Sequence, residues 1–209
     1  NAVLCEETGL LWAFLREQAG METGGTGAKV RTVCSCKGTT CQYGLIDTNA
    51  LSLAIHERFF KGYAGGKLPH KFKIAVSGCP RNCAEATIKD FGVVCVDSGY
   101  ELHVGGNGGI KVRATDLLCK VSTEEEAMTV CAAFIQLYRE EARYLERTAP
   151  WIERVGLDHI KSRLLDNPDA VPAYAERFRF SQRFTQNDPW AKRVAGEDRE
   201  QHEIGRAHV

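Results

Sequence analysis

The sequence lacks a long apolar run, an excess of either charge and a recognisable leader. No stretch of about 18 apolar residues occurs, so no membrane-spanning helix is predicted. The 27 Lys and Arg residues balance the 27 Asp and Glu residues, which gives no support for a nucleic-acid or membrane-surface partner. The first residues, NAVL, contain neither an initiator Met nor a basic segment. We interpret them as the cut edge of a longer chain, not as a signal peptide.

Cysteine, by contrast, is abundant. The chain has nine cysteines, an odd number that does not suit a secreted protein stapled by disulfides. In a reducing compartment, clustered cysteines more often bind metal or carry out redox chemistry. We therefore expect a cytoplasmic protein with a metal site.

The residue periodicity predicts an α+β fold, with a mixed β-sheet, flanking helices and a helical C-terminal region. Strands are expected at 30–33, 72–77, 91–97, 100–104 and 110–113. Helices are expected at 7–18, 48–60, 123–147, from about 151, at 157–165 and at 168–178, with Pro150 ending the long one. The long helix carries an apolar stripe that we expect to pack on the sheet: Met128, Cys131, Phe134, Ile135, Tyr138 and Leu145.

Two groups of cysteines form the candidate site. Cys36 and Cys41 are separated by four residues, and Cys79 and Cys83 by three. Each group is expected where a strand ends and a helix begins, which would expose backbone N–H groups and a positive helix end to the bound metal. A [4Fe–4S] cluster needs four thiolates and gains from N–H donors to its sulfurs. The alternative is structural zinc, but its short cysteine pairs usually have two intervening residues.

The other cysteines and three histidines have simpler interpretations. A buried free cysteine behaves as a small hydrophobic residue, and we assign this role to Cys5, Cys95, Cys119 and Cys131. Two of the histidines lie in expected amphipathic helices and one in a loop. We do not expect ligands among His56, His70 and His159.

Three motifs together resemble the siroheme- and [4Fe–4S]-binding domain of the nitrite/sulfite reductase superfamily. They are CQYGLIDT from Cys41, VSGCPRNCAEA from Val76 and VGGNGGIKVR from Val104. The resemblance covers roughly residues 25–165. Residues 138–156 are similar to the C-terminal part of the large subunit of assimilatory NAD(P)H nitrite reductases, and residues 24–48 are similar to small anaerobic sulfite reductases.

The chain departs from this family at the first ligand. Much of the superfamily has five residues between the first two cysteines, but position 35 here is Ser35. Counted back from Cys41, Cys36 is one residue too near for the family spacing and Cys34 is one residue too far. We choose Cys36 because Lys-Gly-Thr follows it, and Cys34 stays open as the alternative.

The resemblance implies specific roles. Cys36, Cys41, Cys79 and Cys83 would hold the cluster, and Cys83 would also bridge it to the siroheme iron. Siroheme bears eight carboxylates, so its pocket is expected to be rich in donors and in glycines that permit close approach. The candidates are Asn82, Gly106, Asn107, Gly108, Lys111, Arg113 and Arg31. Partners for carboxylates or the anionic cluster are expected among Arg31, Lys37 and Arg81.

The implied activity is the siroheme- and cluster-dependent six-electron reduction of nitrite to ammonia, with this chain as the cofactor-binding half. The alternatives are sulfite reduction to sulfide by the same cofactors, an electron-transfer module without siroheme, and a zinc-stabilised interaction domain. The partners are then an inorganic anion and an electron-donor module, with FAD and NAD(P)H on an upstream region or a partner. The residues that grip the substrate are also expected upstream of this chain.

The same resemblance implies a division of the chain into domains. Residues 1–29 are expected to be the remnant of an upstream half with a linker, and 30–121 the siroheme- and [4Fe–4S]-binding domain. Residues 122–182 would form a helical part of the same unit, followed by a polar tail at 183–209. We interpret residues 203–209 as an artefact of sequence assembly, because EIGRAHV resembles a translated sequencing adapter, and an ordinary disordered tail is the alternative.

Overall fold

The computed structural model describes residues 8–21, 27–61 and 67–183. The chain divides into two compact units, residues 25–185 and residues 1–24 with 186–209. In the second of these, helix α1 (Thr8–Ala19) confirms the predicted N-terminal helix. It ends at Gly20, whose φ of +60° is the left-handed conformation that terminates many helices.

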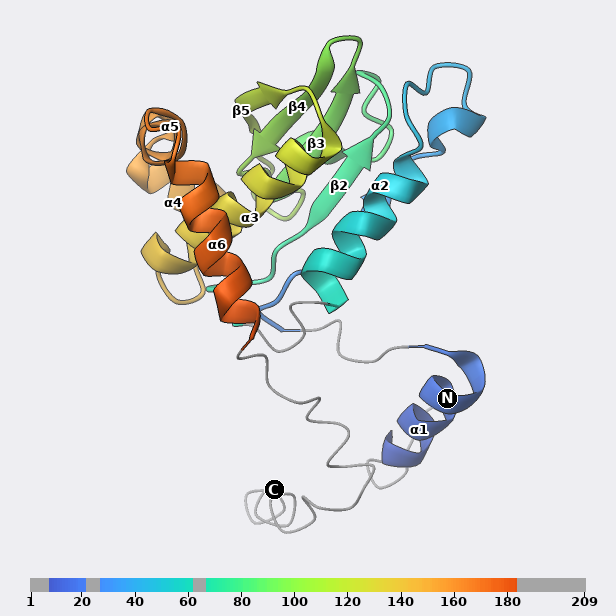
Figure 1. Cartoon of the computed structure of the whole chain (residues 1–209). Coiled ribbons are helices and arrows are strands. Elements are labelled where there is room, and N and C mark those ends of the chain that lie inside the picture. Colours follow the sequence, from blue (N-terminus) through green and yellow to red (C-terminus); the bar gives the residue numbers. More distant parts are fainter. Residues whose placement is uncertain (1–7, 22–26, 62–66, 184–209) are drawn as a thin grey trace, which may run out of the picture. The chain divides into compact units, whose positions relative to one another are not determined.

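The larger unit is built on a five-stranded mixed sheet (Figure 1). The strands follow chain order across it: β1 (Cys34–Ser35), β2 (Ile74–Ser77), β3 (Phe91–Val96), β4 (Gly99–Val104) and β5 (Asp116–Val121). β1, β2 and β3 run parallel, whereas β4 and β5 are antiparallel to their neighbours. This mixed sheet with flanking helices confirms the predicted α+β fold.

The helices of this unit are α2 (Thr48–Ile55), which continues as a π-helix (His56–Lys61), α3 (Glu124–Glu141), α4 (Thr148–Val155), α5 (Leu157–Leu165) and α6 (Ala170–Gln182). Two of them, α2 and α3, begin at a residue whose side chain caps the helix. The carboxylate of Asp47 accepts the first N–H groups of α2. Thr123 and Glu126 form a reciprocal capping box at the start of α3. Among the described residues, no helix is long and apolar enough to cross a membrane.

The two faces of the sheet bury different residues. Because successive side chains in a strand point to opposite faces, Ile74 and Val76 join the main core with the helices, while Ala75 does not. On that other face, Ala75 and Val94 form a small second cluster with alanines from the chain after the second cysteine group. The sheet therefore carries the main core on one face and this small cluster, with Ala84 and Ala86, on the other.

The long helix packs on the sheet as predicted, but it is shorter than expected. Phe134 and Tyr138 are completely buried, and the Phe134 ring contacts Phe72 and Phe91. The helix ends at Glu141, not at residue 147. Leu145 lies beyond it with 59% of its surface exposed, so its place in the apolar stripe was wrong.

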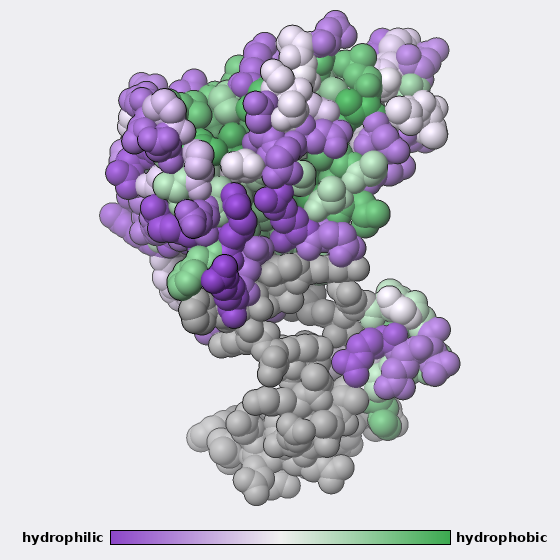
Figure 2. Space-filling model, viewed as in Figure 1, coloured by the Kyte–Doolittle hydropathy of each residue, from purple (hydrophilic) through white to green (hydrophobic). Residues whose placement is uncertain are grey.

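Pro150 does not end the long helix, as the sequence had suggested, but lies in the first turn of α4. Proline is tolerated there because the first N–H groups of a helix have no partner within it. The surface over the helical side of this unit, at the left of Figure 2, is largely hydrophilic.

Two predicted strands are absent from the described sheet. Residues 30–33 form a single bridge from Val30 to Phe72, and the regular strand starts only at Cys34. Residues 110–113 form a loop tip closed by one bridge between Asn107 and Arg113. The strand that follows this loop, β5, was missed.

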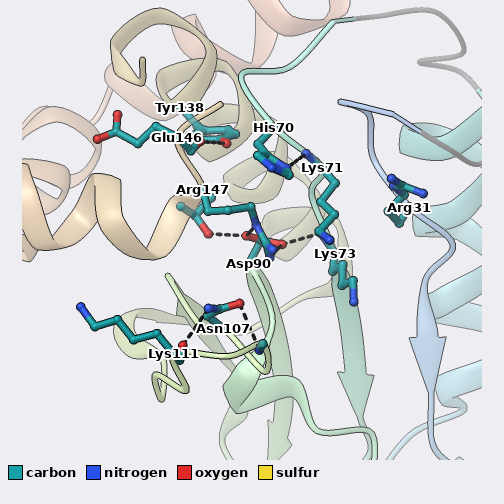
Figure 3. A network of polar contacts seen from close by, with 12 residues as sticks. Arg31, His70, Lys71, Lys73, Asp90, Asn107, Lys111, Tyr138, Glu146 and Arg147 are labelled. Carbon is teal, nitrogen blue, oxygen red and sulfur yellow. Dashed lines mark hydrogen bonds and ion pairs between the residues drawn. The ribbon is translucent and has the colours of Figure 1, made fainter. Parts of the chain in front are cut away.

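A buried carboxylate fixes the sheet to the turn between α3 and α4 (Figure 3). Asp90 is completely buried and pairs with Arg147 at 2.7 Å. It also accepts hydrogen bonds from the Thr148 hydroxyl and from the backbone N–H of Lys73. The Asp90 carbonyl accepts the Gly105 N–H at 3.1 Å, so the same residue anchors the start of the glycine loop.

Candidate metal centre

One pocket of about 880 Å³ brings the four predicted ligands together. Cys36 and Cys41 reach it from the loop after β1, and Cys79 and Cys83 from the loop after β2. Since β1 and β2 are parallel, the loops that follow them leave the same edge of the sheet. The arrangement thus follows directly from the strand topology.

The register of β1 and β2 separates Cys36 from Cys34. Cys34 lies opposite Ala75, and the N–H of Cys36 donates to the carbonyl of Val76 at 3.3 Å. Cys36 is therefore level with Ser77, next to the second cysteine group. Cys34 lies two residues earlier, about 7 Å along the strand. It is exposed, and it does not line the pocket.

The first cysteine loop is shaped by one glycine and one buried threonine. Gly38 has φ +55°, and a Cβ there would lie 2.6 Å from Thr48 Oγ1 and 2.9 Å from the Ile46 carbonyl. The Thr48 hydroxyl donates to the Cys36 carbonyl at 2.7 Å. The N–H of Cys41 donates to the Gly38 carbonyl at 2.9 Å. These contacts hold the loop against the start of α2.

The second cysteine loop is held by an asparagine in the left-handed conformation. Asn82 has φ +56°, which asparagine adopts more readily than most residues. Its side chain accepts the Ser77 hydroxyl at 3.2 Å and donates to Thr87 at 2.6 Å. The Ser77 hydroxyl in turn accepts the Ala84 N–H at 3.2 Å. Asn82, between Cys79 and Cys83, therefore sets the path of the loop.

The α-helix expected after the first cysteine group begins only at Thr48, as α2, and in the described chain no α-helix directly follows the second group. The first group continues into the three-residue 3₁₀ turn Gly38–Thr40, and the second leads to another such turn, Ala86–Ile88. The donors come from loop backbone instead. The N–H of Gly78 donates to Cys36 Sγ at 3.2 Å, a contact between the two loops.

Hydrogen bonds favour the thiolate form of Cys36. Burial by itself would raise its pKa, but bonds from the Gly78 and Gly38 backbone and from Thr48 outweigh that effect. The net result is a pKa below the ordinary value for cysteine. A lowered pKa is the property expected of a cysteine that binds metal, because the thiolate is the ligand.

Two of the three expected cations line the pocket. Lys37 and Arg81 lie on its wall, and the Arg81 guanidinium stacks 3.8 Å from the centre of the Tyr43 ring. Arg31 does not line the pocket, and its backbone N–H donates to the carbonyl of Phe72, two residues before β2. Figure 3 shows it on the side of Lys71 and Lys73.

The glycine loop is packed against its own chain. A Cβ on Gly106 would lie 2.6 Å from the backbone of Ile88 and Lys89, which explains the need for glycine. The Asn107 amide donates to the Lys111 carbonyl at 2.7 Å, and the Gly109 N–H donates back to Asn107.

The two basic residues of this loop are also engaged. Arg113 donates to the carbonyls of Gly105 and Ala114, and it pairs with Asp116 and Glu153. Lys111 pairs with Glu153 at 3.0 Å while 79% of its side chain stays exposed.

In the part of the chain that the structure describes, the other cysteines and the histidines do not line the pocket. Cys95 and Cys131 are buried, as predicted for core cysteines. Burial raises the pKa of Cys119 to about 11. Cys5 lies outside the described residues. The three histidines do not line the pocket: His56 stacks on Phe60, His70 accepts a backbone N–H from the next residue, and His159 pairs with Glu141.

The number of thiols at the pocket suits a cluster. Four cysteines from two loops line it, and in a [4Fe–4S] cluster each of four thiolates binds a different iron. Within residues 8–21, 27–61 and 67–183, no group of three His, Cys, Asp or Glu side chains arranged for one metal ion is found.

Comparison with known proteins identifies the family. Residues 26–170 match the model described as the nitrite and sulphite reductase 4Fe-4S domain. The chain belongs to this family. It is 48% identical over 165 residues to a nitrite reductase [NAD(P)H] of Bacillus subtilis, covering 78% of this chain and 20% of that protein. It is 34% identical over 137 residues to an assimilatory-type sulfite reductase of Nitratidesulfovibrio vulgaris, covering 65% and 61%.

Solved structures share the fold. The chain superimposes on dissimilatory sulfite reductase I with a TM-score of 0.64 at 15% identity, covering 88% of this chain and 59% of that one. For the Mycobacterium tuberculosis NirA protein the TM-score is 0.63 at 21% identity, covering 81% and 32%. The chain therefore has the fold of this family but spans only a fifth of the length of the Bacillus nitrite reductase.

Proposed function

We propose that this chain holds a [4Fe–4S] cluster on Cys36, Cys41, Cys79 and Cys83 and serves the reduction of nitrite. The observation that carries the proposal is the single pocket lined by these four thiols from two loops. The donor set fits the cluster, because four thiolates, a backbone N–H at sulfur and nearby cations are the features that such clusters use. The family match supports the same cofactor.

The proposal includes siroheme bound beside the cluster through Cys83. Cys83 is exposed, so its sulfur is accessible to a second group outside the pocket. Siroheme would supply the metal at which the anion is reduced, while the cluster would store electrons. Asn82 holds the second loop in place next to Cys83, and the glycine loop with Gly106, Asn107 and Gly108 packs against the turn that follows this loop.

The basic residues proposed for siroheme differ in how well they fit this role. The exposed Lys111 pair with Glu153 is readily exchanged for another anion, since exposed ion pairs contribute only about 0–1 kcal/mol. Arg113 already uses its donors on four partners, so we assign it to holding the glycine loop. Arg31 remains a candidate for binding a siroheme carboxylate that lies farther from Cys83.

Nitrite is the proposed substrate, and its support is the 48% identity to the Bacillus nitrite reductase. Sulfite is the alternative, supported by the match to the assimilatory-type sulfite reductase. Because the chain spans a fifth of the nitrite reductase, we place substrate-gripping cations, FAD and NAD(P)H on other parts of a longer protein or on a partner. Free thiols, including the exposed Cys34, suit the reducing cytoplasm.

A second candidate function is electron transfer by the cluster without siroheme. It is favoured by a 35% identity over 99 residues to the assimilatory nitrate reductase electron transfer subunit of Bacillus subtilis, which covers 47% of this chain. It would also explain why several predicted siroheme contacts already have partners within the chain.

Absorption spectroscopy separates the two candidates. The chain would be loaded anaerobically with iron and sulfide and then incubated with siroheme. The proposal is supported if a sharp Soret band and a band in the red join the broad shoulder of the cluster. These two siroheme bands should be lost in Cys83→Ser. A shoulder alone, with siroheme removed by gel filtration, supports the electron-transfer function. Zinc without iron would overturn both.

A further inference from the structure

The two cysteine loops are joined by hydrogen bonds from backbone N–H groups. The N–H of Leu45 donates to the Gly78 carbonyl at 2.9 Å, and the N–H of Gly78 donates to Cys36 Sγ at 3.2 Å. A Cβ on Gly78 would lie 2.9 Å from the Thr48 methyl, so little space remains between the loops at this level.

A second link spans the loops at the wall of the pocket. Tyr43 follows Cys41 by two residues, and Arg81 lies midway between Cys79 and Cys83. The guanidinium carbon of Arg81 lies 3.8 Å from the centre of the Tyr43 ring, and both side chains line the pocket. A cation over an aromatic face at this distance is held by the ring quadrupole.

The link matters because both partners are exposed. Tyr43 has 45% of its surface accessible, and Arg81 is also exposed. An exposed arginine has many rotamers, and water screens its charge when it swings outward. Stacking on Tyr43 removes much of this freedom and keeps the positive charge at the pocket.

We propose that Arg81 is a positioning residue that sets the reduction potential of the cluster, with Tyr43 as the platform that keeps its charge in place. This inference rests on the proposed function, because it requires the cluster. Each electron added to a cluster with four thiolate ligands makes the site more negative. A fixed cation on the pocket wall therefore stabilises the reduced form more than the oxidised form and raises the potential. By joining the loops, the stack also slows the loss of iron.

The test uses the whole chain loaded anaerobically with iron and sulfide. Three properties are measured: iron per chain, the midpoint potential in a dithionite titration followed by absorbance, and the rate of bleaching by an iron chelator. The variants are Arg81→Gln, Arg81→Lys, Tyr43→Phe and Tyr43→Leu. The matched control is Arg179→Gln, which removes an exposed arginine from α6. Circular dichroism checks the fold of each variant.

The expected order of potentials follows from charge and stacking. Arg81→Gln lowers the midpoint potential and speeds bleaching. Arg81→Lys keeps the midpoint potential close to that of wild type, because the positive charge remains. Tyr43→Phe leaves the potential and the bleaching rate unchanged, because the aromatic ring remains. Tyr43→Leu lowers the potential by part of the Arg81→Gln shift, since the cation is no longer held. Arg179→Gln changes neither property.

Contrary outcomes separate this inference from the proposed function. A wild-type chain that takes up no cluster overturns both. A loaded wild type with the same potential in Arg81→Gln overturns the role of Arg81 alone. If Arg81→Gln does not load, the potentials of Tyr43→Leu and Arg81→Lys decide instead. Equal midpoint potentials in Tyr43→Leu and Tyr43→Phe overturn the role of Tyr43 as the platform. If Arg81→Lys lowers the midpoint potential as much as Tyr43→Leu does, the effect of the Arg81 charge is overturned.

Discussion

The backbone N–H of Gly78 donates a hydrogen bond to Cys36 Sγ at 3.2 Å. This contact joins the two cysteine loops and stabilises negative charge on the sulfur. It also places the first loop so close to Gly78 that any side chain there would meet Thr48 and Cys36. The candidate site is thus preformed by backbone contacts.

Gly78→Ala should disturb the site while leaving the sheet intact. Its Cβ would lie 2.9 Å from the Thr48 methyl and 3.5 Å from Cys36 Sγ, so the Gly78 loop or the Thr48 side chain must shift. We expect a cost of about 1–3 kcal/mol in unfolding free energy and reduced iron uptake after anaerobic loading. Gly9→Ala is the control, because nothing lies within 4 Å of Gly9. Unchanged iron uptake in Gly78→Ala would contradict the close contact between the loops.

Asp90→Asn should strongly destabilise the fold. Asp90 is fully buried, and the change leaves Arg147, which is 18% exposed, without its charged partner. Removing one member of a buried ion pair typically costs about 3–5 kcal/mol, and the remaining amide should recover part of this. Urea denaturation measures the loss. Glu101→Gln, which breaks the more exposed pair with Lys120, should cost less than about 1 kcal/mol. Similar losses in both variants would refute the proposed importance of Asp90.

The contribution of Glu146 should depend on pH. Hydrogen bonds from Arg154 are the main reason that the pKa of Glu146 lies below its ordinary value of 4.5. Because the folded-state pKa is lowered, the stabilisation is complete above pH 4.5 and disappears as the pH falls through the folded-state value. Glu146→Gln should therefore be less stable than wild type at pH 7, by about 1 kcal/mol, and the difference should shrink in acid. A difference that stays constant from pH 7 to pH 3 would exclude this explanation.

The sequence predicted local features of the site better than the contacts between its two loops. The helix expected from residue 48 and the buried Cys131 follow local patterns, and the structure reproduces the start of this helix and the burial. The choice between Cys34 and Cys36 depends on the register of β1 against β2, which pairs residues 41 positions apart. The Arg81–Tyr43 stack was missed for the same reason, since no local pattern reports a contact between two loops.

The errors in the fold also have physical causes. The apolar residues Ile110 and Val112 suggested a strand, but both are exposed on a loop tip. The next strand, β5, has adjacent leucines in place of a clean alternation, and its pairing with β4 shifts register at Leu102 and His103. An irregular strand of this kind gives a weak period-two signal.

Cys83→Ser and Cys131→Ser should differ in kind. Cys131 is 1% exposed, so its serine variant should lose about 1–3 kcal/mol of stability through a poorly paired buried hydroxyl and still load iron. Cys83→Ser should keep its stability, because Cys83 is exposed, but lose the siroheme Soret band. Urea denaturation, and absorption spectra recorded after both variants have been through anaerobic loading, test this. A normal Soret band in Cys83→Ser would contradict the bridging role.

The most direct test of the cluster is the iron and acid-labile sulfide content of the chain after anaerobic loading. It would be measured in wild type, in the serine variants of Cys36, Cys41, Cys79 and Cys83, and in Cys34→Ser. We predict about four irons and four sulfides per chain in wild type, the same content in Cys34→Ser, and a marked loss in each of the other four. Retention of the full content in Cys36→Ser with its loss in Cys34→Ser, or zinc in place of iron in wild type, would contradict the account.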